Sequence, residues 1–127
     1  MEIIRENGTG DCFEANGDYI IEVLRKIKDR KTLSSYRICH GLVTGQKSSK
    51  VAGKVFPHAW IEINGEIIID NSNGKQIVGN VKQLYTTGRI IEKSVRRYSP
   101  KEYAKLVLRH GHYGQFENLE EDVDGRN

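Results

Sequence analysis

The chain has few of the residues that mark cross-linked, membrane-spanning or metal-binding proteins. Among 127 residues there are two cysteines, two prolines and one tryptophan, and no apolar run approaches the length of a membrane span. Two cysteines allow one disulfide at most, which excludes a disulfide-framework fold. Neither a Cys-x-x-Cys nor a His-x-x-x-His spacing occurs. We therefore expect no metal and no cofactor.

The N-terminal residues 1–6 also lack the basic-then-apolar layout of a secretory signal. Together with the missing membrane span, this favours a cytoplasmic protein whose thiols stay reduced. A hydrophobic content of 37% and a charged content of 29% are ordinary for a globular chain. The length is sufficient for one domain with a core that needs no cross-links.

Charge is distributed unevenly along the chain. The net charge is +3, but residues 117–127 hold five acids and one base, which leaves about +7 on residues 1–116. We expect residues 1–116 to form a single domain and residues 117–127 to form a flexible acidic tail. A basic body attracts nucleic acid, but its basic residues are scattered and form no aromatic stacking platform, so the sequence disfavours nucleic acid as a partner.

Hydrophobic periodicity and turn residues predict one helix, a run of strands and a second helix. Asn64-Gly65 is typical of a hairpin turn, Ser99-Pro100-Lys101-Glu102 of a helix start and Gly111 of a helix end. The expected helices cover residues 12–29, 80–85 and 100–110, and the expected strands 36–44, 55–63, 66–70 and 89–98. This order predicts an α+β fold, with an N-terminal cysteine-bearing helix on an antiparallel sheet of three to five strands, plus a C-terminal helix.

Three residues have side chains suited to nucleophilic catalysis. Cys12 lies at the expected helix start, after a turn and Asp11 as the expected cap, and His58 opens a strand whose hairpin partner ends in Asp70. A thiol, an imidazole and a carboxylate are the parts of a cysteine nucleophile with its base and orienting group. A helix N-terminus and an adjacent imidazolium both favour a thiolate, and the helix start offers N–H groups to an oxyanion.

The length of the hairpin turn determines which residue orients His58. A three-residue connection places His58 directly opposite Asp70, whereas a two-residue Asn64–Gly65 turn places it opposite Asn71. Either side chain can accept a hydrogen bond from an imidazole N–H. A carboxylate stabilises the imidazolium better than an amide does, so we favour Asp70 over Asn71.

Other residues near these positions have competing interpretations. Trp60 shares the strand face of His58 and is either a wall of the substrate cleft or part of the core. Cys39 lies among apolar strand residues and is expected to be an inert core thiol. His40 points to the opposite face, where we expect it at the surface or half-buried.

The chain also shows a family resemblance. Gly10-Asp11-Cys12 before a helix, the strand Tyr36–Gly41, His58-Ala59-Trp60-Ile61-Glu62-Ile63 and the strand Ile67–Asp70 resemble the transglutaminase-like branch of the papain-like cysteine enzymes. The resemblance covers roughly residues 7–74. It implies that Cys12 is the nucleophile, His58 the general base and acid, and Asp70 its orienting partner. Papain-like enzymes use an upstream amide as an oxyanion donor, and Asn7 is the candidate here.

These observations predict a small cysteine-dependent hydrolase or acyl transferase that acts on an amide or peptide carbonyl through a thioester. Protease, amidase, deamidase and transferase activity all remain open, and the expected substrate is a protein or peptide. The alternative is a catalytically inactive binding module of the same fold. A third hypothesis, based on the basic body, is a nucleic-acid-binding protein.

Overall fold

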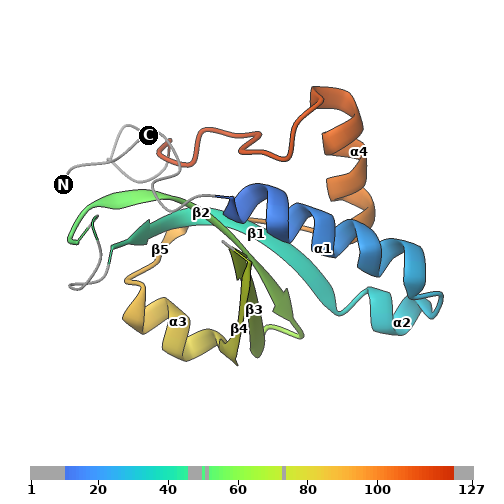
Figure 1. The fold of residues 1–127 in the computed structure, drawn as a ribbon, viewed down its shortest axis with the longest axis horizontal. Helices are drawn as coiled ribbons and strands as arrows, with labels where there is room; N and C mark the ends of the chain where they lie inside the picture. Colours follow the sequence, from blue (N-terminus) through green and yellow to red (C-terminus); the bar gives the residue numbers. More distant parts are fainter. Residues whose placement is uncertain (1–10, 46–49, 51, 73, 122–127) are drawn as a thin grey trace.

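The structure is a computed structural model that describes residues 11–45, 50, 52–72 and 74–121. It confirms the α+β architecture, with a five-stranded antiparallel sheet in the order β4-β3-β2-β1-β5 (Figure 1). The elements are α1 (Cys12–Lys26), α2 (Arg30–Leu33), β1 (Tyr36–Thr44), β2 (Val55–Ile63), β3 (Ile67–Ser72), β4 (Lys75–Asn80), α3 (Val81–Thr87), β5 (Ile91–Tyr98) and α4 (Pro100–His110).

Helices cover both faces of the sheet. Alternate residues of β2 point in opposite directions, so Ile61 packs with α1 and α4, whereas Trp60 packs with α3. Figure 1 shows α1 and α4 on one side of the sheet and α3 on the other. The core cluster on the first face contains Ile20, Val23, Ile38, Ile61, Ile69, Tyr98 and Tyr103. The apolar core on this face therefore holds α1, the helix that begins at Cys12, against β1, β2 and β3.

The first helix is shorter than the sequence predicts. It ends at Lys26 instead of residue 29, because Asp29 caps the separate helix α2 by accepting a hydrogen bond from the N–H of Thr32. Asp11 occupies the N-cap position of α1 but makes no side-chain cap hydrogen bond. Gly17, unfavourable in a helix, lies where an added Cβ would be 2.4 Å from the Tyr103 hydroxyl, so close packing against α4 requires it.

The sequence did not reveal β4. All six of its residues are exposed, so it lacks the apolar–polar alternation that indicates a strand. The helix expected after it is present as α3, and Asn80 caps it by accepting from the N–H of Lys82. The strand expected at 89–98 is confirmed as β5, beginning two residues later.

The C-terminal helix follows its sequence signals closely. Ser99 and Glu102 form a complete capping box, Pro100 lies in the first turn, and Gly111 ends the helix in the left-handed conformation with φ of 73°. The described part of the expected tail is partly packed on the body. Glu117 accepts hydrogen bonds from Tyr98 and Arg96. Leu119 is buried in a cluster with Leu42 and Val55, because its apolar side chain is better placed in the core than in water.

The β2–β3 register differs from both predicted registers. Ile63 pairs with Ile67 across a three-residue connection in which Asn64 and Gly65 have positive φ. Relative to the favoured prediction, β3 is shifted by two residues, so His58 lies directly opposite neither Asp70 nor Asn71. A shift of two preserves the alternation of side chains, and Asp70 therefore stays on the face of His58.

Candidate active site

The candidate site lies where β2 and β3 separate. Their ladder ends at the pair Ile61–Ile69, although both strands continue beyond it. Past this point, the backbone groups of Ala59 and Asn71 are bound by a side chain from α1 instead of by each other. The first turn of α1 consequently reaches the open end of the two strands.

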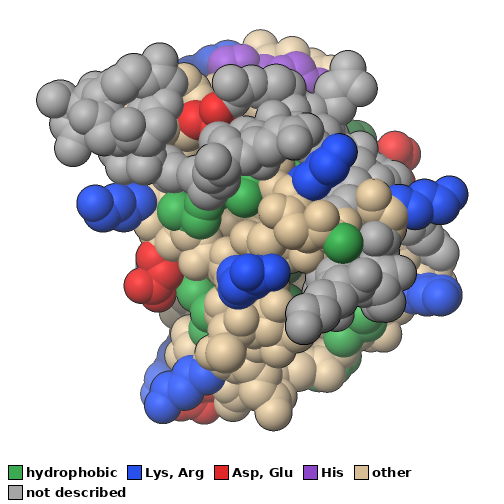
Figure 2. All heavy atoms as spheres, turned by 90° about the vertical axis from the view of Figure 1, so that its left-hand side faces the viewer, with side chains coloured by type: hydrophobic (Ala, Val, Ile, Leu, Met, Phe, Trp, Pro, Cys, Tyr) green, Lys and Arg blue, Asp and Glu red, His purple; other side chains and the backbone are tan. Residues whose placement is uncertain are grey.

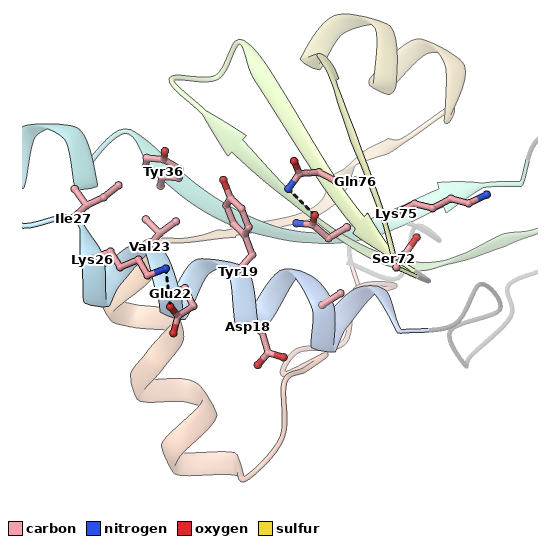
Figure 3. A pocket seen from close by; sticks show the side chains of 13 residues that line it. Asp18, Tyr19, Glu22, Val23, Lys26, Ile27, Tyr36, Ser72, Lys75 and Gln76 are labelled. Atoms are coloured by element: carbon pink, nitrogen blue, oxygen red, sulfur yellow. Dashed lines mark hydrogen bonds and ion pairs between the residues drawn. The ribbon is translucent and has the colours of Figure 1, made fainter.

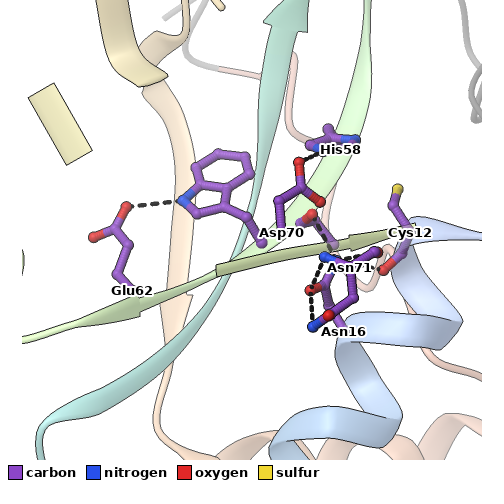
Figure 4. A network of polar contacts seen from close by, with 8 residues as sticks. Cys12, Asn16, His58, Glu62, Asp70 and Asn71 are labelled. Carbon is purple, nitrogen blue, oxygen red and sulfur yellow. Dashed lines mark hydrogen bonds and ion pairs between the residues drawn. The ribbon is translucent and has the colours of Figure 1, made fainter. Parts of the chain in front are cut away.

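Asn16 is the side chain that closes this gap. Its amide nitrogen donates to the carbonyls of Cys12 at 2.8 Å, Ala59 at 3.0 Å and Asn71 at 3.0 Å. Its oxygen accepts from the backbone and side-chain N–H groups of Asn71 at 3.0 and 3.1 Å (Figure 4). Asn16 is fully buried, so these bonds fix the start of α1 relative to both strands. Sequence reasoning missed this role, although a polar residue on the apolar face of a helix was a usable signal.

His58 and Asp70 form the central polar contact of the site. Nε2 of His58 lies 2.7 Å from Oδ2 of Asp70, and the two side chains are only 11% and 16% exposed. Since a carboxylate only accepts, Nε2 carries the proton of this bond. Asn71, the alternative orienting residue, instead donates its side-chain N–H to Asn16 and accepts from Gln76.

The other titratable neighbour of the His58 ring is Cys12. Burial alone would lower the pKa of His58, but hydrogen bonds and charge interactions with Asp70 and Cys12 raise it to about 10. Nε2 is used by Asp70, whereas Nδ1 is buried and has no hydrogen-bond partner among the described residues. Figure 4 shows Cys12 at the start of α1 beside His58 and Asp70. The arrangement can therefore pair a thiolate with an imidazolium.

The thiol of Cys12 is closed off from solvent. Cys12 is 0% exposed, and neither cysteine is in a disulfide. A substrate carbonyl reaches this sulfur only after the surrounding groups move apart. Any chemistry at Cys12 therefore includes an opening step.

Trp60 belongs to the core and also supports the His58 ring. It is fully buried and lies nearly parallel to His58, with an interplanar angle of 22° and ring centroids 6.2 Å apart. Its indole N–H donates to Glu62 at 2.9 Å, and Tyr85 and Arg97 also donate to this carboxylate. Burial favours a higher pKa for Glu62, but the bonds from Tyr85 and Trp60 and the charge of Arg97 lower it overall.

The remaining thiol and histidine candidates lie in the interior. Cys39 is fully buried, and burial together with the charge of Glu62 raises its pKa well above the usual range, which keeps the thiol protonated. His40 was expected at the surface or half-buried, and this expectation is wrong. It is fully buried among the rings of Phe13, Tyr98, Tyr103 and Phe116, and burial lowers its pKa to about 3.

Several expectations concern residues or groups outside this constellation. Asn7, the candidate oxyanion donor, lies outside the described residues. Within the described ranges, no three His, Cys, Asp or Glu side chains are grouped as metal ligands. None of the described helices has the length and apolar character needed to cross a membrane. On the face shown in Figure 2, the described Lys and Arg side chains are dispersed among neutral atoms.

Comparisons with known proteins identify no relative. No protein-family model, curated protein or solved structure gives a significant match to this chain. The functional argument consequently depends on the geometry and chemistry of the chain's own residues.

Proposed function

We propose that this protein is a cysteine-dependent hydrolase or acyl transferase that acts on an amide or peptide carbonyl. Cys12 is the nucleophile, His58 the general base and acid, and Asp70 the group that orients His58. The observation that supports this most strongly is the position of His58. Its ring is hydrogen-bonded to Asp70 at 2.7 Å, and its neighbours Asp70 and Cys12 raise its pKa to about 10 against the effect of burial.

In the proposed reaction, the Cys12 thiolate attacks the carbonyl carbon and a C–S bond forms. Backbone N–H groups at the start of α1 stabilise the oxyanion. His58 then gives its proton to the leaving nitrogen, the C–N bond breaks, and a thioester remains. Water or an amine attacks the thioester and loses a proton to His58. The products are a carboxylic acid or a new amide, together with the regenerated Cys12 thiolate and protonated His58.

One specific observation favours a second candidate function. Because Cys12 is 0% exposed, the structure as it stands admits no substrate to the sulfur. A binding module of the same fold that never opens would retain the Cys12–His58–Asp70 contacts for stability alone. The two candidates differ in whether the Cys12 thiol becomes accessible in solution.

Alkylation with iodoacetamide at pH 7, followed by peptide mapping, tests accessibility. We expect Cys12 to be labelled at least tenfold faster than Cys39, because burial holds the Cys39 thiol protonated. A Cys39→Ala variant should keep the fast phase, and Asp70→Asn should slow it. Equally slow labelling of both thiols would support the binding module.

Turnover is tested separately on unfolded casein with a fluorescent primary amine in the buffer. Mass spectrometry distinguishes backbone cleavage, deamidation of glutamine and amine incorporation. We expect one of these products with the wild-type chain and none with Cys12→Ala. A product that persists in Cys12→Ala would overturn the assignment of the nucleophile.

A further inference from the structure

Strand β4 forms one edge of the sheet. It pairs antiparallel with β3 along its whole length, from Lys75 opposite Ser72 to Asn80 opposite Ile67. Among the described residues, no strand pairs with its other side. The outward-facing N–H and C=O groups of β4 are thus available to another extended chain.

The side chains of β4 differ from those that usually protect an edge. Natural edge strands carry charges, prolines or bulges that prevent further pairing. Here the middle of the strand is Ile77 and Val78, which are 64% and 62% exposed. Ile77 pairs with Asp70 and Val78 with Ile69, so the two apolar side chains extend the two opposite faces of the sheet. An added strand would cover both of them.

The size of the edge favours a peptide over a second copy of the chain. A strand of six residues offers far less area than the roughly 1,200–2,000 Å² of a stable protein interface. A short edge is suited to a peptide segment that pairs with the strand reversibly. The edge also has a charge at each end, because Lys75 and Lys82 are exposed and make no ion pair with the described residues. An acidic residue near each end of the added strand would complement them.

The edge is also connected to the candidate active site. Gln76 of β4 donates to the side chain of Asn71, which in turn is bonded to Asn16 beside Cys12. A cavity of about 650 Å³ between α1 and the β3–β4 turn is lined by Tyr19 and Gln76, among others (Figure 3). A chain paired with β4 would therefore end beside this cavity.

We propose that β4 is a docking edge for an extended polypeptide segment with apolar residues in its centre and an acidic residue near each end. The segment adds to the sheet as a sixth strand next to β4. If the proposed enzymatic function holds, this segment belongs to the substrate, which is then a polypeptide and not a small amide. The assignment of this segment to the substrate rests on the proposed function, whereas the binding of a segment to β4 does not.

Binding is measured by fluorescence anisotropy with a fluorescein-labelled peptide, Glu-Thr-Val-Thr-Val-Glu, blocked at both ends. The Cys12→Ala chain is used, so that the result is independent of catalysis. We expect saturable binding below 1 mM. Two N-methylated forms of the peptide, modified on alternate residues, test strand pairing. Methylation of the set that faces β4 should abolish binding, and methylation of the other set should preserve it.

Matched variants test the surface. Ile77→Ser and Val78→Ser should each weaken binding about tenfold, since each loses burial of a branched side chain. Leu108→Ser on α4 removes an equally apolar side chain, 85% exposed, and should change nothing. Exchanging both Glu residues of the peptide for Gln should weaken binding and reduce its dependence on salt.

Two outcomes would overturn the docking edge. The first is that the labelled peptide does not bind at concentrations up to 1 mM, or that both methylated peptides lose binding to the same extent. The other is a dimer in sedimentation equilibrium that dissociates in Ile77→Ser while no peptide binds, because the edge would then be a contact between two copies. Either result would leave the casein assay unaffected, so failure of the docking edge is distinguishable from failure of the proposed enzyme.

Discussion

His58 and Asp70 meet diagonally across the gap between β2 and β3, with Nε2 and Oδ2 at 2.7 Å. They belong to strands whose ladder has already ended at Ile61 and Ile69. The contact therefore depends on where α1 holds the two strands and not on ladder hydrogen bonds between them. Asp70 and Cys12 both raise the pKa of His58, and this effect leads to the first prediction.

The pKa of His58 is expected to depend on both of its neighbours. An NMR titration of the His58 ring should give a pKa of about 10 in the wild-type chain and lower values in Asp70→Asn and in Cys12→Ala, because each change removes a partner that raises it. Glu92→Ala, at an exposed position of β5, is the control and should leave the value unchanged. A normal pKa in all four proteins would show that the constellation does not form in solution.

The raised pKa also gives His58 a defined effect on stability. Its folded-state pKa lies above the unfolded value of about 6.5, so the contribution is fully present below that pH and is lost as the pH rises through about 10. The free energy of unfolding of the wild type should therefore fall more steeply between pH 7 and pH 10 than that of Asp70→Asn. Parallel curves for the two proteins would contradict the pairing.

Replacing Asn16 should destabilise the protein strongly. Asn16→Ala leaves the carbonyls of Ala59 and Asn71 and the N–H of Asn71 without their partner, at about 1–3 kcal/mol for each buried group. We expect a loss of about 3 kcal/mol or more in urea unfolding. Asn80→Ala removes an exposed helix cap and should cost only about 1 kcal/mol. Equal losses would mean that the gap is closed by something other than Asn16.

Glu62 is expected to be a second stability centre, on the α3 face. Glu62→Ala leaves the indole N–H of Trp60 and the hydroxyl of Tyr85 without their acceptor and removes the ion pair with Arg97, which predicts a loss of about 3 kcal/mol. Trp60 is the only tryptophan, so its fluorescence reports both unfolding and any local change. The exposed Glu92→Ala is the control. Unchanged emission and stability in Glu62→Ala would contradict this prediction.

His40 should make the fold sensitive to acid. Its pKa is about 3 in the folded protein and about 6.5 when unfolded, so its contribution is fully present above pH 6.5 and is lost as the pH falls towards 3. At pH 4.5 the expected loss is roughly 2–3 kcal/mol relative to pH 7. His40→Leu has no proton to take up and should show a flatter curve. The variant should fold at pH 7, because neither ring nitrogen of His40 has a hydrogen-bond partner among the described residues.

Local signals were sufficient to predict much of the architecture. The capping box at Ser99, the Asn64–Gly65 turn and the alternating residues of the central strands each follow from neighbouring residues, so three helices and four strands were predicted. The short helix α2 was not predicted. The β2–β3 register was not predicted, because the same Asn-Gly pair fits turns of different length and different position, and the observed three-residue turn covers 64–66 instead of 63–65. β4 was missed because an exposed edge strand gives no burial pattern.

The site could be predicted as a set of residue types but not as an arrangement. Cys12, His58 and Asp70 were selected as candidates by their chemistry, although His58 and Asp70 lie within β2 and β3 and not at their ends. The role of Asn16 depends on three segments that meet only in the folded chain, and no local pattern contains that information. The burial of His40 likewise results from aromatic residues distant in sequence.

The pairing of β2 with β3 limits where this part of the chain can change in length. One amino acid inserted within the paired segment Ile67–Ile69 would turn every later side chain of β3 to the other face and carry Asp70 away from the imidazole. An amino acid added to the turn at residues 64–66 would lengthen the turn and leave the register unchanged. Tolerated changes of length at this hairpin should therefore lie in the turn and not in the strand.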